Sequence, residues 1–150
     1  MAQITKKKIV QKKQTNQVEQ NDPEKLIQQL SKSTGENGAL KEIVQCLNGG
    51  KPSIKENALI TLGKIANHDA KLAQYVVDAG AIPLIVQCLT DPKHIAAAAL
   101  SNIVKYSLEL AQYVVDAGGI AAIVDFARNI RGTDRLPGIM CLGEIAAKSE

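Results

Sequence analysis

Aromatic residues are scarce in this sequence of 150 residues, which contains no tryptophan, one phenylalanine and three tyrosines. Proteins that bind single-stranded nucleic acids stack the bases on aromatic side chains, so this composition argues against such a partner. Long apolar runs are also missing. No stretch approaches the roughly 20 apolar residues that a transmembrane helix needs, and the opening MAQITKKKIV lacks a secretory signal core. We expect an intracellular protein with no nucleic-acid partner and no membrane span.

Cysteine and histidine are too few and too scattered to indicate a metal site or a catalytic centre. Cys46 and Cys88 lie at equivalent positions of two apolar segments, and Cys141 lies in another, so all three fit small core residues. His68 and His94 have unrelated surroundings, with no recurring carboxylate or cysteine. The paired glycines lack the pattern of a phosphate-binding loop. We therefore expect a non-catalytic protein without a cofactor.

The feature that stands out is an internal repeat. The nine residues LAQYVVDAG at Leu72–Gly80 recur unchanged at Leu110–Gly118. The same register extends along the chain, because Gly38, Gly80 and Gly118 recur at nearly equal intervals, and so do Leu62, Leu100 and Leu142. A period of roughly 40 residues with helical patterning is typical of armadillo or HEAT repeats. The sequence predicts an all-α, right-handed superhelix (an α-solenoid) of about three armadillo repeats, at residues 23–68, 69–106 and 107–150.

Turn and capping residues predict three helices in each repeat. In the middle repeat we expect helices at Lys71–Asp78, Ile82–Leu89 and Pro92–Tyr106. Gly80 and Gly118 can adopt the left-handed conformation that ends a helix, and Pro52 and Pro92 suit a first helical turn. The expected N-terminal caps are Asp91 before the third helix and, before the short helices, the equivalent residues Asp69, Ser107 and Ser149. The helix expected from Asp22-Pro23 to about Leu30 is a degenerate entry to the array, because a long loop follows it.

Two irregularities interrupt the register. The middle repeat has four fewer residues between its second and third helices than the first repeat. At 3.6 residues per turn this deletion rotates the apolar pattern by only about 40°, so Leu62, Leu100 and Leu142 should remain equivalent buried positions. The second irregularity is at Glu150, where we expect the array to be incomplete. The last repeat should expose apolar residues there, so we expect self-association through this end, or a gain in stability when a further short helix is appended.

The amino-terminal residues 1–22 differ in composition from the rest. They carry a cluster of lysines, namely Lys6, Lys7, Lys8, Lys12 and Lys13, against only two acidic residues, so this tail accounts for the whole net charge of +3. It has few large apolar side chains and should be disordered. A solvated tail, an electrostatic contact with the acidic tails of tubulin, an anionic membrane surface and a nuclear-localisation signal all fit this charge.

From Gly38 to Glu150 the chain resembles the sperm-associated antigen six family, armadillo-repeat proteins of the central apparatus of cilia and flagella. The resemblance rests on LAQYVVDAG followed by GAIPLIVQCL, and on GGIAAIVDFARNIRGTDRLPGIMCLGEIAAKSE. Its most diagnostic piece is Arg135–Met140, because armadillo repeats rarely place Pro-Gly inside the third helix. Family members carry more repeats, so this chain resembles a shortened form.

The resemblance implies a structural protein without catalytic residues. It places the chain in the cytoplasm and cytoskeleton, in the axoneme of a cilium or flagellum, where it supports the central microtubule pair and motility. The implied partners are tubulin and other components of the central apparatus. The alternative is a general armadillo adaptor for proteins or peptides in signalling, adhesion or nuclear transport.

Armadillo import adaptors bind peptides along a groove on their third helices, using a tryptophan and an asparagine one turn apart. The corresponding pairs in this sequence are Ile60 with Lys64, Ala98 with Asn102, and Met140 with Glu144. No tryptophan is present and only one asparagine remains, which argues against recognition of an import signal. Lys64, Asn102 and Glu144 are either solvated helix residues or the lining of a groove for another partner.

Overall fold

The protein is described here by a computed structural model, which covers residues 2–6, 22–32, 38–49, 51–90 and 93–149. These residues are helical, with turns between the helices and no strand. Residues 2–6 form a short helical piece. The remaining elements are α2 (Pro23–Lys32), α3 (Gly38–Gln45), α4 (Pro52–His68), α5 (Ala70–Asp78), α6 (Ala81–Gln87), α7 (Lys93–Val104), α8 (Leu108–Asp116), α9 (Gly119–Asn129), the 3₁₀ helix η1 (Gly132–Arg135) and α10 (Leu136–Lys148).

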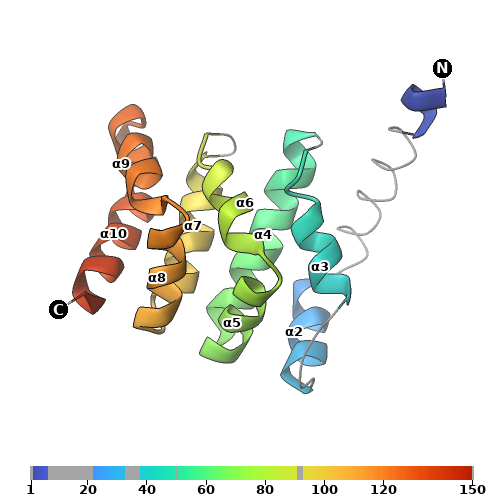
Figure 1. Cartoon of the computed structure of the whole chain (residues 1–150), viewed down its shortest axis with the longest axis horizontal. Helices are drawn as coiled ribbons and strands as arrows, with labels where there is room; N and C mark the ends of the chain where they lie inside the picture. The colour runs from blue at the N-terminus through green and yellow to red at the C-terminus, as the bar shows by residue number, and fades with distance from the viewer. Residues whose placement is uncertain (1, 7–21, 33–37, 50, 91–92, 150) are drawn as a thin grey trace.

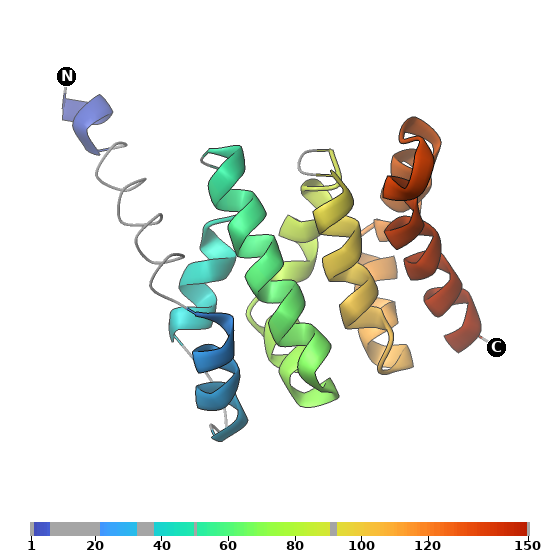
Figure 2. The ribbon, with the colours of Figure 1, turned by 180° about the vertical axis from the view of Figure 1, so that it is seen from behind.

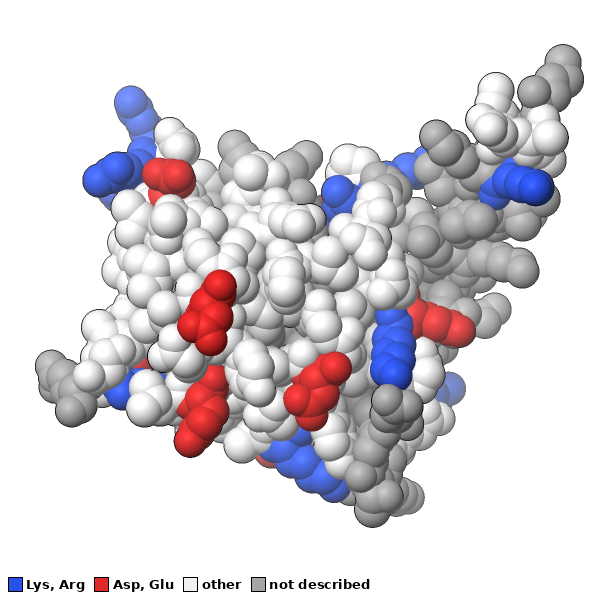
Figure 3. All heavy atoms as spheres, in the orientation of Figure 1, with Lys and Arg blue, Asp and Glu red and all other residues white. Residues whose placement is uncertain are grey.

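The helices group into three successive repeats, α2–α4, α5–α7 and α8–α10, which lie side by side along the long axis of the molecule (Figure 1). The third helices α4, α7 and α10 pack against one another in a layer of their own (Figure 2). The shorter helices cover the other side, where charged side chains are scattered over a mostly uncharged surface (Figure 3). This arrangement confirms the predicted armadillo solenoid. The prediction that α2 is a degenerate entry to the array is corrected. The helix α2 contacts α4 and α5 in the way that α5, the first helix of the next repeat, contacts α7 and α8.

Two of the four expected capping residues, Asp69 and Ser107, act as predicted. The Asp69 side chain accepts a hydrogen bond from the Leu72 backbone amide at 2.8 Å, and Ser107 accepts one from Leu110 at 3.2 Å. Gly80 and Gly118 have φ angles of 81° and 75°, so each adopts the left-handed conformation that lets one helix end and the next begin. The predicted cap Asp91 and the first-turn Pro92 lie outside the described residues.

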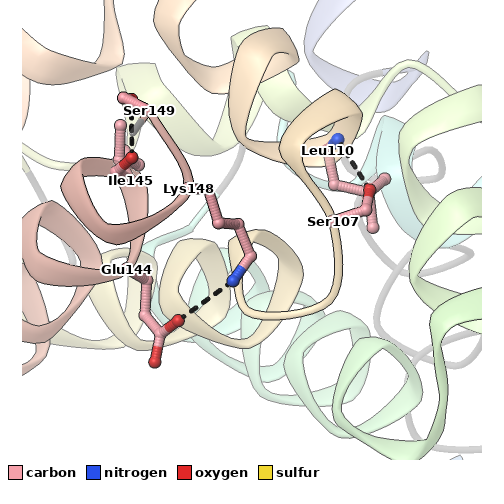
Figure 4. A network of polar contacts seen from close by, with 6 residues as sticks. All are labelled: Ser107, Leu110, Glu144, Ile145, Lys148 and Ser149. Atoms are coloured by element: carbon pink, nitrogen blue, oxygen red, sulfur yellow. Dashed lines mark hydrogen bonds and ion pairs between the residues drawn. The ribbon is translucent and has the colours of Figure 1, made fainter.

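Ser149 differs from its two counterparts. Its hydroxyl donates a hydrogen bond to the Ile145 carbonyl at 2.8 Å, within the last turn of α10 (Figure 4). The hydroxyls of serine and threonine readily form such bonds to the carbonyl four residues earlier. Ser149 therefore bonds back to the helix that precedes it.

Pro137 and Gly138 lie inside the third helix, as the sequence predicts, but at its start. The helix α10 begins at Leu136 and Pro137 is in its first turn. Proline lacks an amide hydrogen and its ring collides with the preceding turn, so η1 precedes the helix instead. Gly138 is buried, and a Cβ there would lie 2.7 Å from two ring carbons of Phe126. This glycine is what allows α9 and α10 to approach closely.

The third helix has 17 residues in the first repeat (α4) and 12 in the second (α7). Leu62 and Leu100 are both fully buried, so the apolar pattern stays in phase as predicted. Leu142 is only partly buried, which corrects the prediction for the third position. In the described part of the chain, the outer side of α10 has no further repeat packed against it.

Within the described residues, no single helix is both long and apolar enough to cross a membrane. The helices α8 and α9 reach the required length and composition only together, across a bend of 78°.

Candidate functional site

The third-helix layer contains an open groove between α4 and α7, with a volume of about 300 Å³. The first turn of α10 contributes Pro137 to its wall. Two of the three residues predicted to line a binding groove, Lys64 and Asn102, are both part of it. The full lining is Leu59, Ile60, Gly63, Lys64, Asn67, His94, Ile95, Ala98, Ala99, Asn102 and Pro137.

The floor of the groove is set by close contact between α4 and α7. Gly63 has no side chain, and the position of its missing Cβ is 3.6 Å from the Cα of Ala99. The Asn102 side chain donates a hydrogen bond from Nδ2 to the Gly63 carbonyl oxygen at 3.3 Å. This bond spans 39 residues of sequence. It holds the partly exposed amide of Asn102 in a defined position inside the groove.

A second set of polar contacts joins the carboxyl-terminal ends of α4 and α7. The Tyr106 hydroxyl donates to the Asn67 carbonyl oxygen at 2.6 Å, and Lys105 donates from Nζ to Asn67 Oδ1. The Lys105 ammonium also lies 5.0 Å from the centre of the Tyr106 ring, close enough for a cation–π interaction. The sequence analysis missed these residues. The repeat register could have revealed the pairing of Asn67 with Lys105, because these residues occupy the same position in successive repeats, as do Leu62 and Leu100.

Glu144, the third predicted groove residue, is not among the residues that line this groove. It lies further along the layer on α10 and forms an ion pair with Lys148, with 3.3 Å between Glu144 Oε2 and Lys148 Nζ (Figure 4). The two residues are four apart on one helix, a spacing that brings such side chains together. The structure therefore unites Lys64 with Asn102 and leaves Glu144 apart from them.

The predicted electrostatic tail is described at one position only. Lys6 is exposed, in the helical piece at residues 2–6. Lys7, Lys8, Lys12 and Lys13 lie outside the described residues, so the role of this tail stays a prediction.

The three cysteines are buried, as the sequence predicted. Burial, with a smaller contribution from Glu144, raises the pKa of Cys141 to about 12. Burial, followed by the charge of Glu42, also raises the pKa of Cys46. Thiols with raised pKa values are poor nucleophiles and poor metal ligands, since both roles require the thiolate. No group of three or more potential metal ligands occurs among the described residues.

No protein-family model and no curated protein sequence matches this chain. Solved structures of designed armadillo-repeat proteins do match it. One is 26% identical over 81% of the chain, with a TM-score of 0.72. Another, solved in complex with the peptide (KR)4, is 21% identical over 91% of the chain, also with a TM-score of 0.72. A third, designed for modular peptide recognition, is 24% identical over 71%, with a TM-score of 0.68.

The chain spans about half the length of these three proteins, covering 51%, 56% and 47% of them. The agreement extends over most of the described helices of this chain. Together with the repeated helix trios and the continuous layer of third helices, it shows that this chain has an armadillo-repeat fold.

Proposed function

We propose that this chain is a non-catalytic protein-binding scaffold, whose groove between α4 and α7 receives an extended segment of a partner protein. The observation that carries the proposal is the fixed, partly exposed amide of Asn102 within an open, mainly apolar groove. A side-chain amide can both donate and accept hydrogen bonds, which suits the backbone of an extended peptide. The designed armadillo relatives support the same use of this fold, because one was solved with a bound peptide and another was made for peptide recognition.

The charges of the groove favour an acidic or uncharged segment. Lys64 is exposed on its wall, and Lys105 is held beside it through Asn67. Among the described residues that line the groove, none is an aspartate or glutamate. A basic segment such as (KR)4 would meet the like charge of Lys64, whereas an acidic segment would be attracted to it.

Substituting Lys64 with glutamate is therefore expected to weaken binding of an acidic peptide such as (DE)4 by roughly tenfold at low salt, and to improve binding of (KR)4. Titrations followed by the fluorescence anisotropy of labelled peptides measure both affinities. Lys71→Glu is the matched control, because it changes the net charge equally but lies on α5, away from the groove. If Lys64→Glu and Lys71→Glu behave alike, or if the unchanged protein prefers (KR)4, the proposed site is wrong.

The same proposal extends to a cellular role. The resemblance of Gly38–Glu150 to central-apparatus proteins supports a scaffold in the axoneme of a cilium or flagellum, where it would contact tubulin and other components of the central pair. The positive charges of Lys64 in the groove and of the lysines in the amino-terminal tail fit the acidic tails of tubulin. A general adaptor in signalling, adhesion or nuclear transport is the alternative. A fluorescently tagged copy in a ciliated cell distinguishes them, because only the axonemal scaffold would concentrate along the central pair.

Deleting residues 1–20 is expected to weaken co-sedimentation with microtubules roughly tenfold at low ionic strength, and much less near 0.15 M salt, where exposed charges are screened beyond about 8 Å. The expectation follows from the five lysines in this segment. Sedimentation over a salt series measures it, with microtubules lacking their acidic tails as a control. Equal binding with and without the segment at every salt concentration contradicts a role for the tail.

A further inference from the structure

A second groove lies on the side of the shorter helices, between α6 and α9 (Figure 1). Its volume is about 360 Å³, at the low end of the range for pockets that bind ligands. The described residues that line it come from α6, from α9 and from the turns that follow these two helices. They are Val86, Leu89, Thr90, Ala122, Asp125, Phe126, Asn129 and Ile130. Both walls of the groove are therefore present in the structure.

The two walls of this groove differ in length. Both helices begin directly after a left-handed glycine, but α6 has 7 residues and α9 has 11. The additional turn of α9, at residues 126–129, therefore extends past the position at which α6 ends. Phe126 lies at the base of the groove, because it lines the groove but is only 4% exposed. Its ring packs against the backbone of α10 at Gly138, which holds the base in place.

The polar side chains of this groove offer mainly hydrogen-bond acceptors. The Thr90 hydroxyl donates its hydrogen to the Gln87 carbonyl oxygen at 3.0 Å, so its oxygen is left to accept. Asn129 donates from Nδ2 to the Asp125 carbonyl oxygen at 2.8 Å, and its Oδ1 is left to accept. The Asp125 carboxylate is the one charged group among the described lining residues, and it forms no ion pair with another described residue. A cation that donates hydrogen bonds complements this set of acceptors.

The surroundings of Asp125 restrict which cation fits. Two arginines are exposed nearby in the sequence, Arg128 on α9 and Arg131 after it, and neither lines the groove. Their charge disfavours a segment with several basic residues in a row. The rest of the lining is mainly apolar and favours hydrocarbon beside the cation. A single lysine or arginine between apolar residues meets both conditions, because its side chain joins an apolar stem to a charged end.

We propose that the groove between α6 and α9 is a second binding site, which takes a segment of a partner protein with one lysine or arginine between apolar residues. The charged end of that side chain pairs with Asp125, and its stem and neighbours contact the apolar lining. The array then binds segments of opposite charge on its two sides, since Lys64 favours an acidic segment in the other groove. No residue lines both grooves, so each proposal can fail without the other.

Three labelled peptides that differ only in their central residue, SGLVKLVGS, SGLVELVGS and SGLVQLVGS, test the proposal by fluorescence anisotropy. The lysine peptide is expected to bind roughly tenfold more tightly than the glutamate peptide, with the glutamine peptide between them. Asp125→Asn removes the charge and keeps the shape, so it should weaken binding of the lysine peptide roughly fivefold and leave the glutamine peptide unchanged. Asp78→Asn is the matched control, because Asp78 is an exposed aspartate on α5, outside the groove.

Filling the groove gives an independent test. Ala122 lines the groove and is partly exposed, so Ala122→Leu should weaken all three peptides while circular dichroism shows an unchanged helix content. Lys64→Glu alters only the other groove and should leave the lysine peptide unaffected. The proposal is overturned by equal affinity for the lysine and glutamate peptides, by no measurable binding, or by equal effects of Asp125→Asn and Asp78→Asn. Self-association that Asp125→Asn abolishes, measured by sedimentation equilibrium, would make a second copy the occupant and also overturns it.

Discussion

Substituting Gly119 with alanine is expected to lower the free energy of unfolding by about 1–3 kcal/mol or more, the range found when an atom is forced into a close-packed region. Gly119 is the first residue of α9, and a Cβ at this position would lie 2.4 Å from Val114 Cγ1 and 2.6 Å from the Val114 carbonyl oxygen. The backbone oxygen cannot rotate away as the end of a side chain can, so α8 and α9 must shift. Urea denaturation followed by circular dichroism measures the loss.

Gly143→Ala is the matched control. Gly143 lies within α10, is exposed, and has no atom within 4 Å of the Cβ position, so alanine should stabilise the protein by up to about 1 kcal/mol through its higher helix propensity. The residue equivalent to Gly119 in the middle repeat is Ala81. An alignment of the repeats would therefore predict that Gly119→Ala leaves the stability unchanged. A neutral result for Gly119→Ala would show that the contact between α8 and α9 is looser than described.

The second large effect is expected at the repeated leucine position. Leu100 is fully buried in α7, between the first and third repeats, and Leu100→Ala should cost about 2–5 kcal/mol through lost burial and the cavity left behind. The partly buried Leu142 should lose roughly half as much or less when changed to alanine, because less apolar surface is removed from contact. The comparison requires a protein concentration at which the chain is monomeric. Equal losses at the two positions would mean that Leu142 is as well covered as Leu100.

Much of this fold was predictable because the repeats contain the residues that begin and end their helices. Asp69 and Ser107 precede equivalent helices, and Gly80 and Gly118 separate the first helix of a repeat from the second. Local chemistry decides these features, and it is visible in the sequence. The helix ends in the middle repeat agree with the structure to within two residues, at Ala70–Asp78, Ala81–Gln87 and Lys93–Val104.

The errors lie where a position depends on what surrounds it. Leu142 occupies the repeat position of the buried residues Leu62 and Leu100, but it is only partly buried. The 3₁₀ helix η1 before α10 was not predicted, because the repeat alignment does not show it.

The candidate site was predictable in part for the same reason. Lys64 and Asn102 share a repeat position, so stacked third helices bring them to one groove. The role of Gly63 depends on the distance between α4 and α7, which the sequence pattern does not reveal, whereas Asn67 could have been found from the repeat position that it shares with Lys105. The contribution of Pro137 to the groove wall depends on how α10 packs against α7, which the repeat pattern does not show.

The two copies of LAQYVVDAG allow local opening to be compared between two repeats of the same chain. Amide hydrogen exchange depends on an intrinsic chemical rate, which neighbouring residues set, and on how often the structure opens. The intrinsic rates at Val77 and Val115 are nearly the same, because the two valines have identical neighbours. The ratio of their protection factors therefore reports directly how much one armadillo repeat stabilises the repeat before it, within one molecule and one experiment.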